Sequence, residues 1–218
     1  ETPVRGIAKG SEKSVAVVNE TLFYHSRNGI VAYGGGSPEP IYSVFGDISY
    51  SNAVGGALDD KYYVSMKEGN NYHLFVYDTD KNMWHREDNL KVDDFAYLDG
   101  NLYYLSDGNI GTIKKISEGE SHMISWSAEF SDFSATMNKK YVSRLLFRLE
   151  LEENSIFNIS INYGDKWEIV ASLTGLKKKS YNVPIPIKRC DSYKIKLSGI
   201  GKFKLYSMTK VVTEGSDL

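Results

Sequence analysis

This sequence of 218 residues contains little cysteine and proline and no long apolar run. Cys190 is the only cysteine, so no disulfide can form within the chain and a disulfide-stapled secreted scaffold is excluded; we expect a small buried apolar residue at that position. No apolar run approaches the roughly 20 residues that span a bilayer and no signal peptide is visible, so no membrane partner is expected. The chain begins Glu1-Thr2 without methionine, which predicts a piece of a longer polypeptide.

The sequence also lacks a convergent set of catalytic or metal-binding residues. No two histidines stand two or four residues apart and no second cysteine completes a zinc site; the histidines are His25, His73, His85 and His122. Its paired carboxylates are adjacent, so a strand would point them to opposite faces and a turn would leave both in solvent. These pairs are Asp59-Asp60, Asp93-Asp94 and Glu152-Glu153. We therefore expect no catalytic residue, no cofactor and no metal, and a protein that is not an enzyme.

What the chain does contain is aromatic residues and glycine, with 16 Tyr, 9 Phe and 19 Gly beside only 5 Pro. This composition favours strands and tight turns, and no helix is predicted. Charge is divided unevenly: residues 1–120 carry 18 acidic and 11 basic residues, net −7, and residues 121–218 carry 10 acidic and 15 basic residues, net +5. The asymmetry predicts two domains with different surfaces.

A pattern in the first half recurs every 40 residues. An apolar residue, a two-residue polar turn and an apolar or aromatic strand follow one another at 58–63, at 98–103 and, more loosely, at 18–23. A period of about 40 to 50 residues is typical of β-propeller blades, small sheets that bury their faces only against neighbouring blades. We therefore predict a propeller-like β-repeat region over 1–120. Three blades cannot close a ring, since propellers have roughly four to eight. Either earlier residues complete the ring, or the blades form an open arc whose edges need cover.

The second repeat resembles a kelch-type blade. Its Gly55-Gly56-Ala57-Leu58 leads through a turn to the aromatic Tyr62-Tyr63, and Tyr77-Asp78 precedes Trp84. Kelch repeats usually carry a glycine pair after the aromatic strand, where this chain has Ser65-Met66. The resemblance is therefore to the blade and not to the kelch family itself.

From about residue 121 the period is lost, and seven strand-length runs at roughly ten-residue spacing predict an antiparallel β-sandwich over 121–218. The runs are 123–130, 142–151, 157–163, 167–173, 180–187, 192–197 and 203–212. Alternation supports this interpretation, because Leu145, Phe147, Leu149 and Leu151 fall on one face of a strand. The predicted fold class is all-β, with partial propeller-like blades followed by the sandwich.

Two local motifs are interpreted as turn devices. The run Gly34-Gly35-Gly36 is followed by neither the Lys-Ser/Thr of a phosphate-binding loop nor a helix, which favours a loop between blades. Residues 160–167 resemble the Ser-x-Asp-x-Gly-x-x-Trp hairpin of sialidase-like proteins, with Asn162 at the Asp position. That resemblance implies a side-chain cap on the hairpin, a positive φ at Gly164 and a Trp167 packed beneath it.

Aromatic and basic residues of the second domain suggest binding functions as an alternative. Trp126 or Trp167 could stack on sugars, although both lie among strand residues, where a core position is favoured. The basic runs 177–179 and 188–189 could contact phosphates or an acidic protein, with a solvated hairpin tip as the other interpretation. A carbohydrate-binding module for host-surface recognition is thus the alternative function. A glycosidase needs two carboxylates converging in a propeller mouth, for which too few blades are present.

The C-terminal residues resemble the end of a family of structural proteins encoded by phages and prophages of Gram-positive bacteria, and the match extends back through 142–150 and, more weakly, into the blade at 76–88. The similar residues are Pro184-Ile185-Pro186, Arg189-Cys190-Asp191, 194–201, Leu205-Tyr206-Ser207 and 214–218. The resemblance implies a DNA-stabilisation, nozzle or tail-hub component of the tail or head-tail connector, located in the virion and acting through protein-protein assembly. Its implied partners are other virion proteins, with contact to genome DNA left open. Opposite domain charges favour head-to-tail contacts, which generate rings when the rotation closes.

Overall fold

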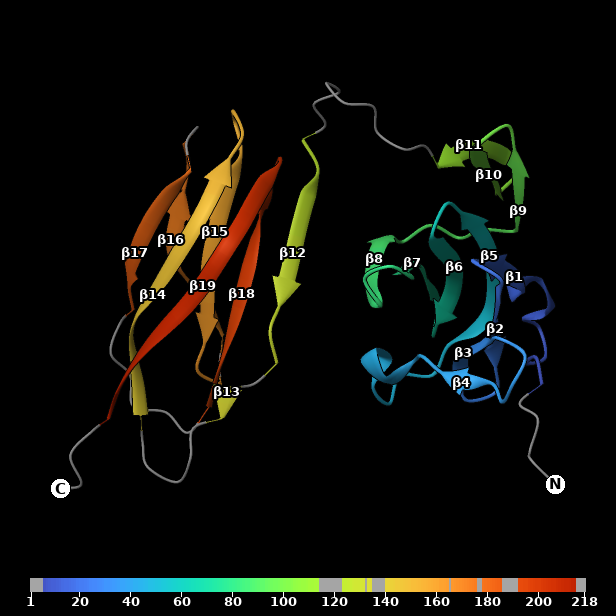
Figure 1. The fold of residues 1–218 in the computed structure, drawn as a ribbon, viewed down its shortest axis with the longest axis horizontal. Coiled ribbons are helices and arrows are strands. Elements are labelled where there is room, and N and C mark those ends of the chain that lie inside the picture. The colour runs from blue at the N-terminus through green and yellow to red at the C-terminus, as the bar shows by residue number, and fades with distance from the viewer. Residues whose placement is uncertain are drawn as a thin grey trace. The chain divides into compact units, whose positions relative to one another are not determined.

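The computed structural model describes residues 6–113, 123–131, 133–134, 140–164, 166–175, 178–185 and 192–214. Over these residues it is all-β (Figure 1), which confirms the predicted fold class. Two short 3-10 turns, η1 (Glu12–Ser14) and η2 (Ser43–Phe45), accompany the strands, and no described helix is long and apolar enough to cross a membrane.

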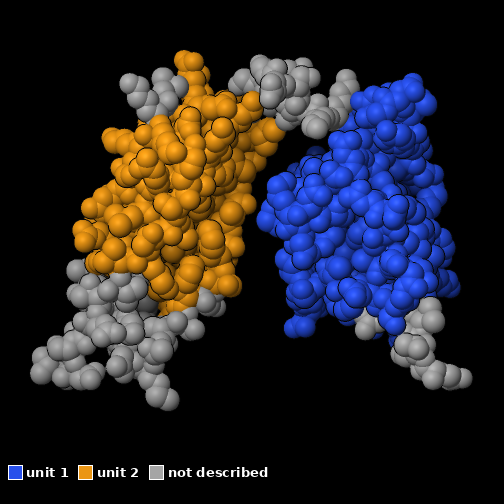
Figure 2. Space-filling view, in the orientation of Figure 1, with its two compact units in different colours: residues 1–116 blue, residues 117–218 orange. Residues whose placement is uncertain are grey.

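The chain divides into two compact units, Glu1–Ile116 and Ser117–Leu218 (Figure 2). The boundary expected between residues 120 and 121 lies outside the described residues. Each unit has buried clusters of its own, so each is described by itself.

Unit 1 contains three antiparallel sheets, each a meander in which consecutive strands pair. Blade 1 comprises β1 (Ala16–Val18), β2 (Thr21–Ser26), β3 (Gly29–Tyr33) and β4 (Glu39–Pro40). Blade 2 comprises β5 (Ser51–Leu58), β6 (Lys61–Glu68), β7 (Asn71–Asp78) and β8 (Met83–Asp88). Blade 3 comprises β9 (Asp94–Leu98), β10 (Asn101–Ser106) and β11 (Asn109–Ile113). The first strands pack in chain order, β1 on β5 and β5 on β9, as innermost strands do in a propeller.

The 40-residue repeat corresponds to equivalent hairpin turns. The residues flanking each turn pair directly, in the registers Val18↔Thr21, Leu58↔Lys61 and Leu98↔Asn101. The first turn residue has a positive φ in all three copies, 46° at Asn19, 49° at Asp59 and 49° at Asp99. Two-residue hairpins need this left-handed backbone, and Asn and Asp tolerate it better than most residues. The repeated turn chemistry therefore sets where each blade begins.

Unit 2 is a β-sandwich. One sheet has the strand order β12-β18-β15-β16, with β13 also paired to β18, and the other has the order β17-β14-β19. The strands are β12 (Ser125–Glu129), β13 (Phe133–Ser134), β14 (Lys140–Leu151), β15 (Ile156–Asn162), β16 (Trp167–Leu173), β17 (Lys179–Pro184), β18 (Ser192–Ile200) and β19 (Phe203–Glu214). All seven predicted runs correspond to strands. The two-residue β13 was not predicted, because it is too short to show an alternating pattern.

The core of the sandwich follows the predicted alternation. Leu145, Phe147, Leu149 and Leu151 are all buried on β14, while Arg148 between them is exposed. They pack against alternate residues of the facing sheet, and the whole cluster is Leu145, Phe147, Leu149, Leu151, Phe157, Ile159, Ile161, Val183, Ile185, Tyr193, Ile195 and Leu197. A sheet with one buried face requires apolar side chains at every second residue of its strands.

One detail of unit 1 differs from the sequence prediction. The glycine run Gly34–Gly36 lies within blade 1, where it connects β3 to the two-residue β4, and so the expected loop between blades is wrong. The strand following this run was not predicted because two residues, Glu39 and Pro40, form no alternating pattern.

Candidate functional site

Each blade has two faces, whose positions recur with the 40-residue period. We call the face toward the preceding blade the leading face and the face toward the following blade the trailing face. The trailing face of blade 1 carries Val18, Phe23 and Ile30, which are buried in one cluster with residues of blade 2. The ring of Phe23 stacks on Tyr62 with centroids 5.2 Å apart and lies 5.8 Å from the ring of Tyr77. Blade 1 is thus joined to blade 2 by aromatic packing.

The trailing face of blade 2 is covered in the same way by blade 3. Leu58 and Val76 form a buried cluster with Leu102 of β10. Phe95 of β9 lies directly over β5, since a Cβ added to Gly56 would stand 2.8 Å from its ring. Blade 2 is therefore covered on both faces, and its glycine permits the close approach of the next blade.

The trailing face of blade 3 has no comparable cover among the described residues. Its Leu98 is equivalent to Leu58 in the repeat, yet Leu98 is 59% exposed and Leu58 is 6% exposed. Its Ile110 is equivalent to Ile30 of blade 1, yet Ile110 is 77% exposed and Ile30 is 1% exposed. Leu105 pairs with Ile110 across the sheet and is exposed as well. An apolar face that the other two blades bury is bare here.

The leading face of blade 1 is bare in part. Val15, Val17 and Tyr33 are exposed, whereas Tyr24 and Val31 on the same face are buried. Val15 and Tyr33 are equivalent to Phe95 and Ile113, each 80 residues further along the chain, which pack on the buried cluster between blades 2 and 3. The two ends of the three-blade row thus present the two halves of one kind of interface.

The innermost strands line a groove of about 550 Å³, to which Val17 of β1, Gly55 of β5 and Tyr97 of β9 contribute. At the end where these strands begin, the Lys13 Nζ donates to the Asp94 Oδ2 at 2.8 Å and to a backbone carbonyl at 3.0 Å. In a closed propeller such strands surround the central channel. The groove therefore has the position that one side of such a channel has in a closed propeller.

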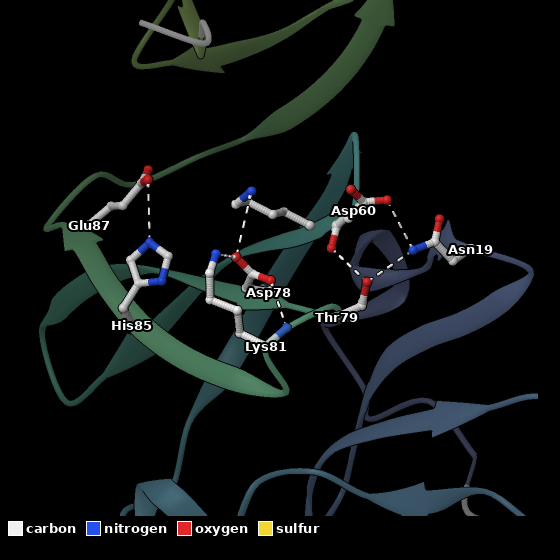
Figure 3. A network of polar contacts seen from close by, with 8 residues as sticks. Asn19, Asp60, Asp78, Thr79, Lys81, His85 and Glu87 are labelled. Carbon is white, nitrogen blue, oxygen red and sulfur yellow. Dashed lines mark hydrogen bonds and ion pairs between the residues drawn. The ribbon is translucent and has the colours of Figure 1, made fainter. Parts of the chain in front are cut away.

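A polar network joins the hairpin turns of blades 1 and 2 (Figure 3). The Asn19 Nδ2 donates to the Asp60 Oδ1 at 3.2 Å and to the Thr79 Oγ1 at 3.0 Å, and the Thr79 hydroxyl donates to the Asp60 carbonyl at 2.8 Å. Beside it, the carboxylate of Asp78 is buried and lies 2.6 Å from the Lys81 Nζ. Hydrogen bonds from Lys81 lower the pKa of Asp78. These carboxylates therefore hold turns together.

A pocket of about 210 Å³ lies between blade 1 and the segment 42–50. Tyr42, Tyr50 and Asp47 line it, and Asp47 is the single carboxylate among its described lining residues. His25 also borders the pocket, but its Nδ1 lies 3.0 Å from the Ser11 Oγ, and burial lowers its pKa. The pocket therefore lacks the two carboxylates that glycoside hydrolysis needs.

The predicted carboxylate pairs lie in turns and connecting segments. Asp59 and Asp60 form the β5–β6 turn, and residues 152–153 are exposed after β14. Asp93 lies 2.9 Å from the Lys91 Nζ, and this ion pair precedes β9. The three pairs thus lie apart from one another, in a hairpin turn or in segments next to strands.

The histidines do not gather either. His73 lies 3.1 Å from Glu68, and His85 lies 3.5 Å from Glu87. No group of three His, Cys, Asp or Glu residues capable of holding a metal occurs in the described part of the chain. His122 and Cys190, with the basic run 188–189, lie outside the described residues.

The hairpin at 160–167 adopts the capped turn that its motif implied. The amide of Gly164 donates to the Asn162 Oδ1 at 2.6 Å, and Gly164 has a φ of 117°. Trp167 pairs with Asn162 across the hairpin, and the Nζ of Lys196 lies 4.4 Å from its ring centroid. The tryptophan is half-buried and lies against a lysine of β18, two strands away in the same sheet, and not in the core.

Trp126 and Lys178, also suggested for sugar or phosphate binding, make contacts within the sandwich, whereas residue 177 lies outside the described residues. Trp126 packs at 4.1 Å from the ring of Phe203 and 5.2 Å from that of Phe157. The Nζ of Lys178 lies 3.6 Å from the ring centroid of Tyr206. These contacts leave Trp126 poorly placed to stack on a sugar.

Sequence reasoning missed the bare trailing face of blade 3 and the roles of two serines. The Ser65 hydroxyl donates to the Leu90 carbonyl at 2.8 Å and accepts from the Val92 amide at 3.1 Å, and the Ser14 carbonyl accepts from the Tyr62 hydroxyl at 2.7 Å. The available signal was the repeat itself. Residues equivalent to buried positions of blades 1 and 2 mark a face that needs cover.

Comparisons with known proteins give no family. No family model matches the sequence, and no curated protein does. Among solved structures, this chain is similar to exo-β-1,3-galactanase from Phanerochaete chrysosporium bound to β-1,3-galactotriose, with 9% identity and a TM-score of 0.29. The galactose-bound structure of that enzyme matches with 9% identity and a TM-score of 0.26. Each alignment covers 85% of this chain and 65% of the galactanase chain. Similarity this distant carries no argument about activity.

Proposed function

We propose that this protein is a non-enzymatic structural component of a phage virion, in the tail or head-tail connector, and that it acts by assembling with other proteins. The observation that carries the assembly role is the bare trailing face of blade 3, with Leu98 and Ile110 exposed at positions that equivalent blades bury. Exposed apolar patches of this kind mark protein interaction sites. The virion assignment rests on the resemblance of the C-terminal residues, part of which lie outside the described ranges.

The proposal of a non-enzymatic role is supported by where the acidic groups lie. Among the described residues they occupy hairpin turns, surface positions and ion pairs such as Asp78 with Lys81 and Asp93 with Lys91. Hydrolysis of a glycosidic bond needs two carboxyl groups about 5 to 10 Å apart across a substrate, and the two hollows described above offer no such pair.

The test is whether the protein is part of the particle. Particles purified from the bacterium that carries the gene are washed in high salt and analysed by quantitative mass spectrometry, with the major capsid protein as the internal standard. We expect this chain at a fixed, small ratio to the capsid protein. Its absence from particles that contain the other tail proteins would contradict the virion role.

The alternative function is a carbohydrate-binding module for host-surface recognition. It rests on Trp167, which is half-buried and has the Lys196 Nζ 4.4 Å from its ring centroid. Binding to a glycan array that is lost in Trp167→Ala and kept in Trp84→Phe, whose tryptophan lies in the other unit, would support it. Equal binding by Trp167→Ala and the unchanged chain would exclude that site.

A further inference from the structure

We propose that the partner on the bare trailing face of blade 3 is the leading face of blade 1 of a second copy, so that two chains form one six-bladed ring. This inference rests on the assembly role proposed above and names its partner. The starting observation is that one interface type occurs twice within the chain. Blade 1 packs on blade 2, and blade 2 on blade 3, through equivalent positions of the repeat.

The two unfilled halves of that interface lie at opposite ends of the blade row. Leu98, Leu105 and Ile110 form the exposed trailing half, and Val15 and Tyr33 belong to the exposed leading half. A heterologous contact between them repeats the geometry already present inside the chain. The occupant is therefore a sheet with the leading-face pattern, which this chain itself supplies.

For these 218 residues, the number of blades selects two copies. Known propellers contain roughly four to eight blades. Two copies of a three-bladed row give six, within this range, whereas three copies give nine, outside it. In such a ring the groove lined by Val17, Gly55 and Tyr97 becomes one half of a central channel.

The charges at the hairpin turns predict how the ring responds to salt. Within the chain, Asn19 of one blade reaches Asp60 of the next. The equivalent contact between copies places Asp99 beside Glu20 of the second copy, two like charges. Because salt screens such repulsion, association strengthens as salt is added. Association driven by attraction between the oppositely charged units would instead weaken as salt is added.

The experiment is sedimentation velocity of the 218-residue chain over a range of protein and salt concentrations. The trailing-face variant is Leu98→Asp with Ile110→Asp, and the leading-face variant is Val15→Asp with Tyr33→Asp. The control is Ile169→Asp, at a residue of the sandwich that is 68% exposed. Intact blades in each variant are verified by the fluorescence of Trp84, which lies in blade 2, in matched chains whose Trp126 and Trp167 are replaced by phenylalanine.

We expect the unchanged chain and the control to form dimers of equal strength. Each double variant should raise the dimer dissociation constant at least about a hundredfold, because two buried apolar side chains per interface are replaced by charges. A mixture of the two variants should recover part of the association, since one intact interface forms between unlike copies.

Three results would overturn the inference. These are a chain that stays monomeric at every salt concentration, a trailing-face variant that dimerises like the control, and a leading-face variant that dimerises normally. The last result would mean that trailing faces pair with each other. None of these results contradicts the virion role, which is tested separately by the protein composition of the particles.

Discussion

Replacing Tyr62 with phenylalanine tests the idea that blade packing depends on satisfied polar groups within an aromatic core. Tyr62 is fully buried, and its hydroxyl donates to the Ser14 carbonyl at 2.7 Å. Burial raises the pKa of Tyr62 far above its usual value, so the neutral donor is present at any ordinary pH. The ring of Phe23 stacks on Tyr62 at 5.2 Å, and phenylalanine preserves this contact. The substitution therefore removes a hydrogen bond and almost no volume.

The expected cost follows from what remains in the folded state. Ser14 is fully buried, so its carbonyl loses its donor and cannot reach water. Leaving a buried acceptor unsatisfied costs about 1–3 kcal/mol. With a urea m-value of about 2 kcal/mol per M for a domain of this size, the unfolding midpoint of unit 1 should fall by about 0.5–1.5 M.

Urea unfolding followed by tryptophan fluorescence measures this shift in unit 1. Trp84 reports on the blades, whereas Trp126 and Trp167 report on the sandwich, so a chain with both sandwich tryptophans replaced by phenylalanine isolates the blade signal. The matched control is Tyr72→Phe at the partly exposed start of β7. If Tyr62→Phe shifts the midpoint no more than this control does, the hydrogen bond to Ser14 does not hold the blades together.

Three further predictions concern titration, turn capping and strand packing. Burial lowers the pKa of His25 in the folded state below its value of about 6.5 in the unfolded state. The folded protein is therefore fully stabilised at pH values above about 6.5, where His25 is neutral in both states. This stabilisation is lost as the pH falls through the lower pKa of the folded state. His25→Gln should therefore flatten the fall in blade stability between neutral and mildly acidic pH; an unchanged slope would exclude this residue as its source. In the sandwich, Asn162→Ala should cost about 1 kcal/mol through loss of the bond from the Gly164 amide, whereas Asn162→Asp should keep it; equal thermal midpoints for the two variants would contradict the cap. Gly199→Ala should destabilise the sandwich by about 1–3 kcal/mol or more, because its Cβ would stand 1.9 Å from the Ile156 carbonyl oxygen; a neutral effect in chemical denaturation would show that the strands separate easily.

Much of the fold is predictable from local sequence alone. The hairpin turns at Asn19, Asp59 and Asp99 are encoded by residues that tolerate a positive φ, and their 40-residue spacing places three blades. The strand that carries Leu145 to Leu151 is encoded by a period of two, which a half-buried sheet requires. These features depend on residues close together in the chain.

The candidate site depends on contacts between distant residues, which no local pattern contains. Asn19 meets Asp60 and Thr79, which lie 41 and 60 residues further along the chain. β13 pairs with β18 although it has only two residues, because a neighbouring strand supplies the partner.

By itself, the sequence determined the turns, the alternation of apolar side chains and therefore the all-β class. Only the tertiary structure decided which of these apolar faces is covered. Leu58 and Leu98 occupy equivalent positions in the repeat, yet one is 6% and the other 59% exposed. The reason is physical: side-chain periodicity sets which face is apolar, whereas burial of that face requires a second sheet, and the blade that would follow blade 3 is supplied by no described segment of the chain.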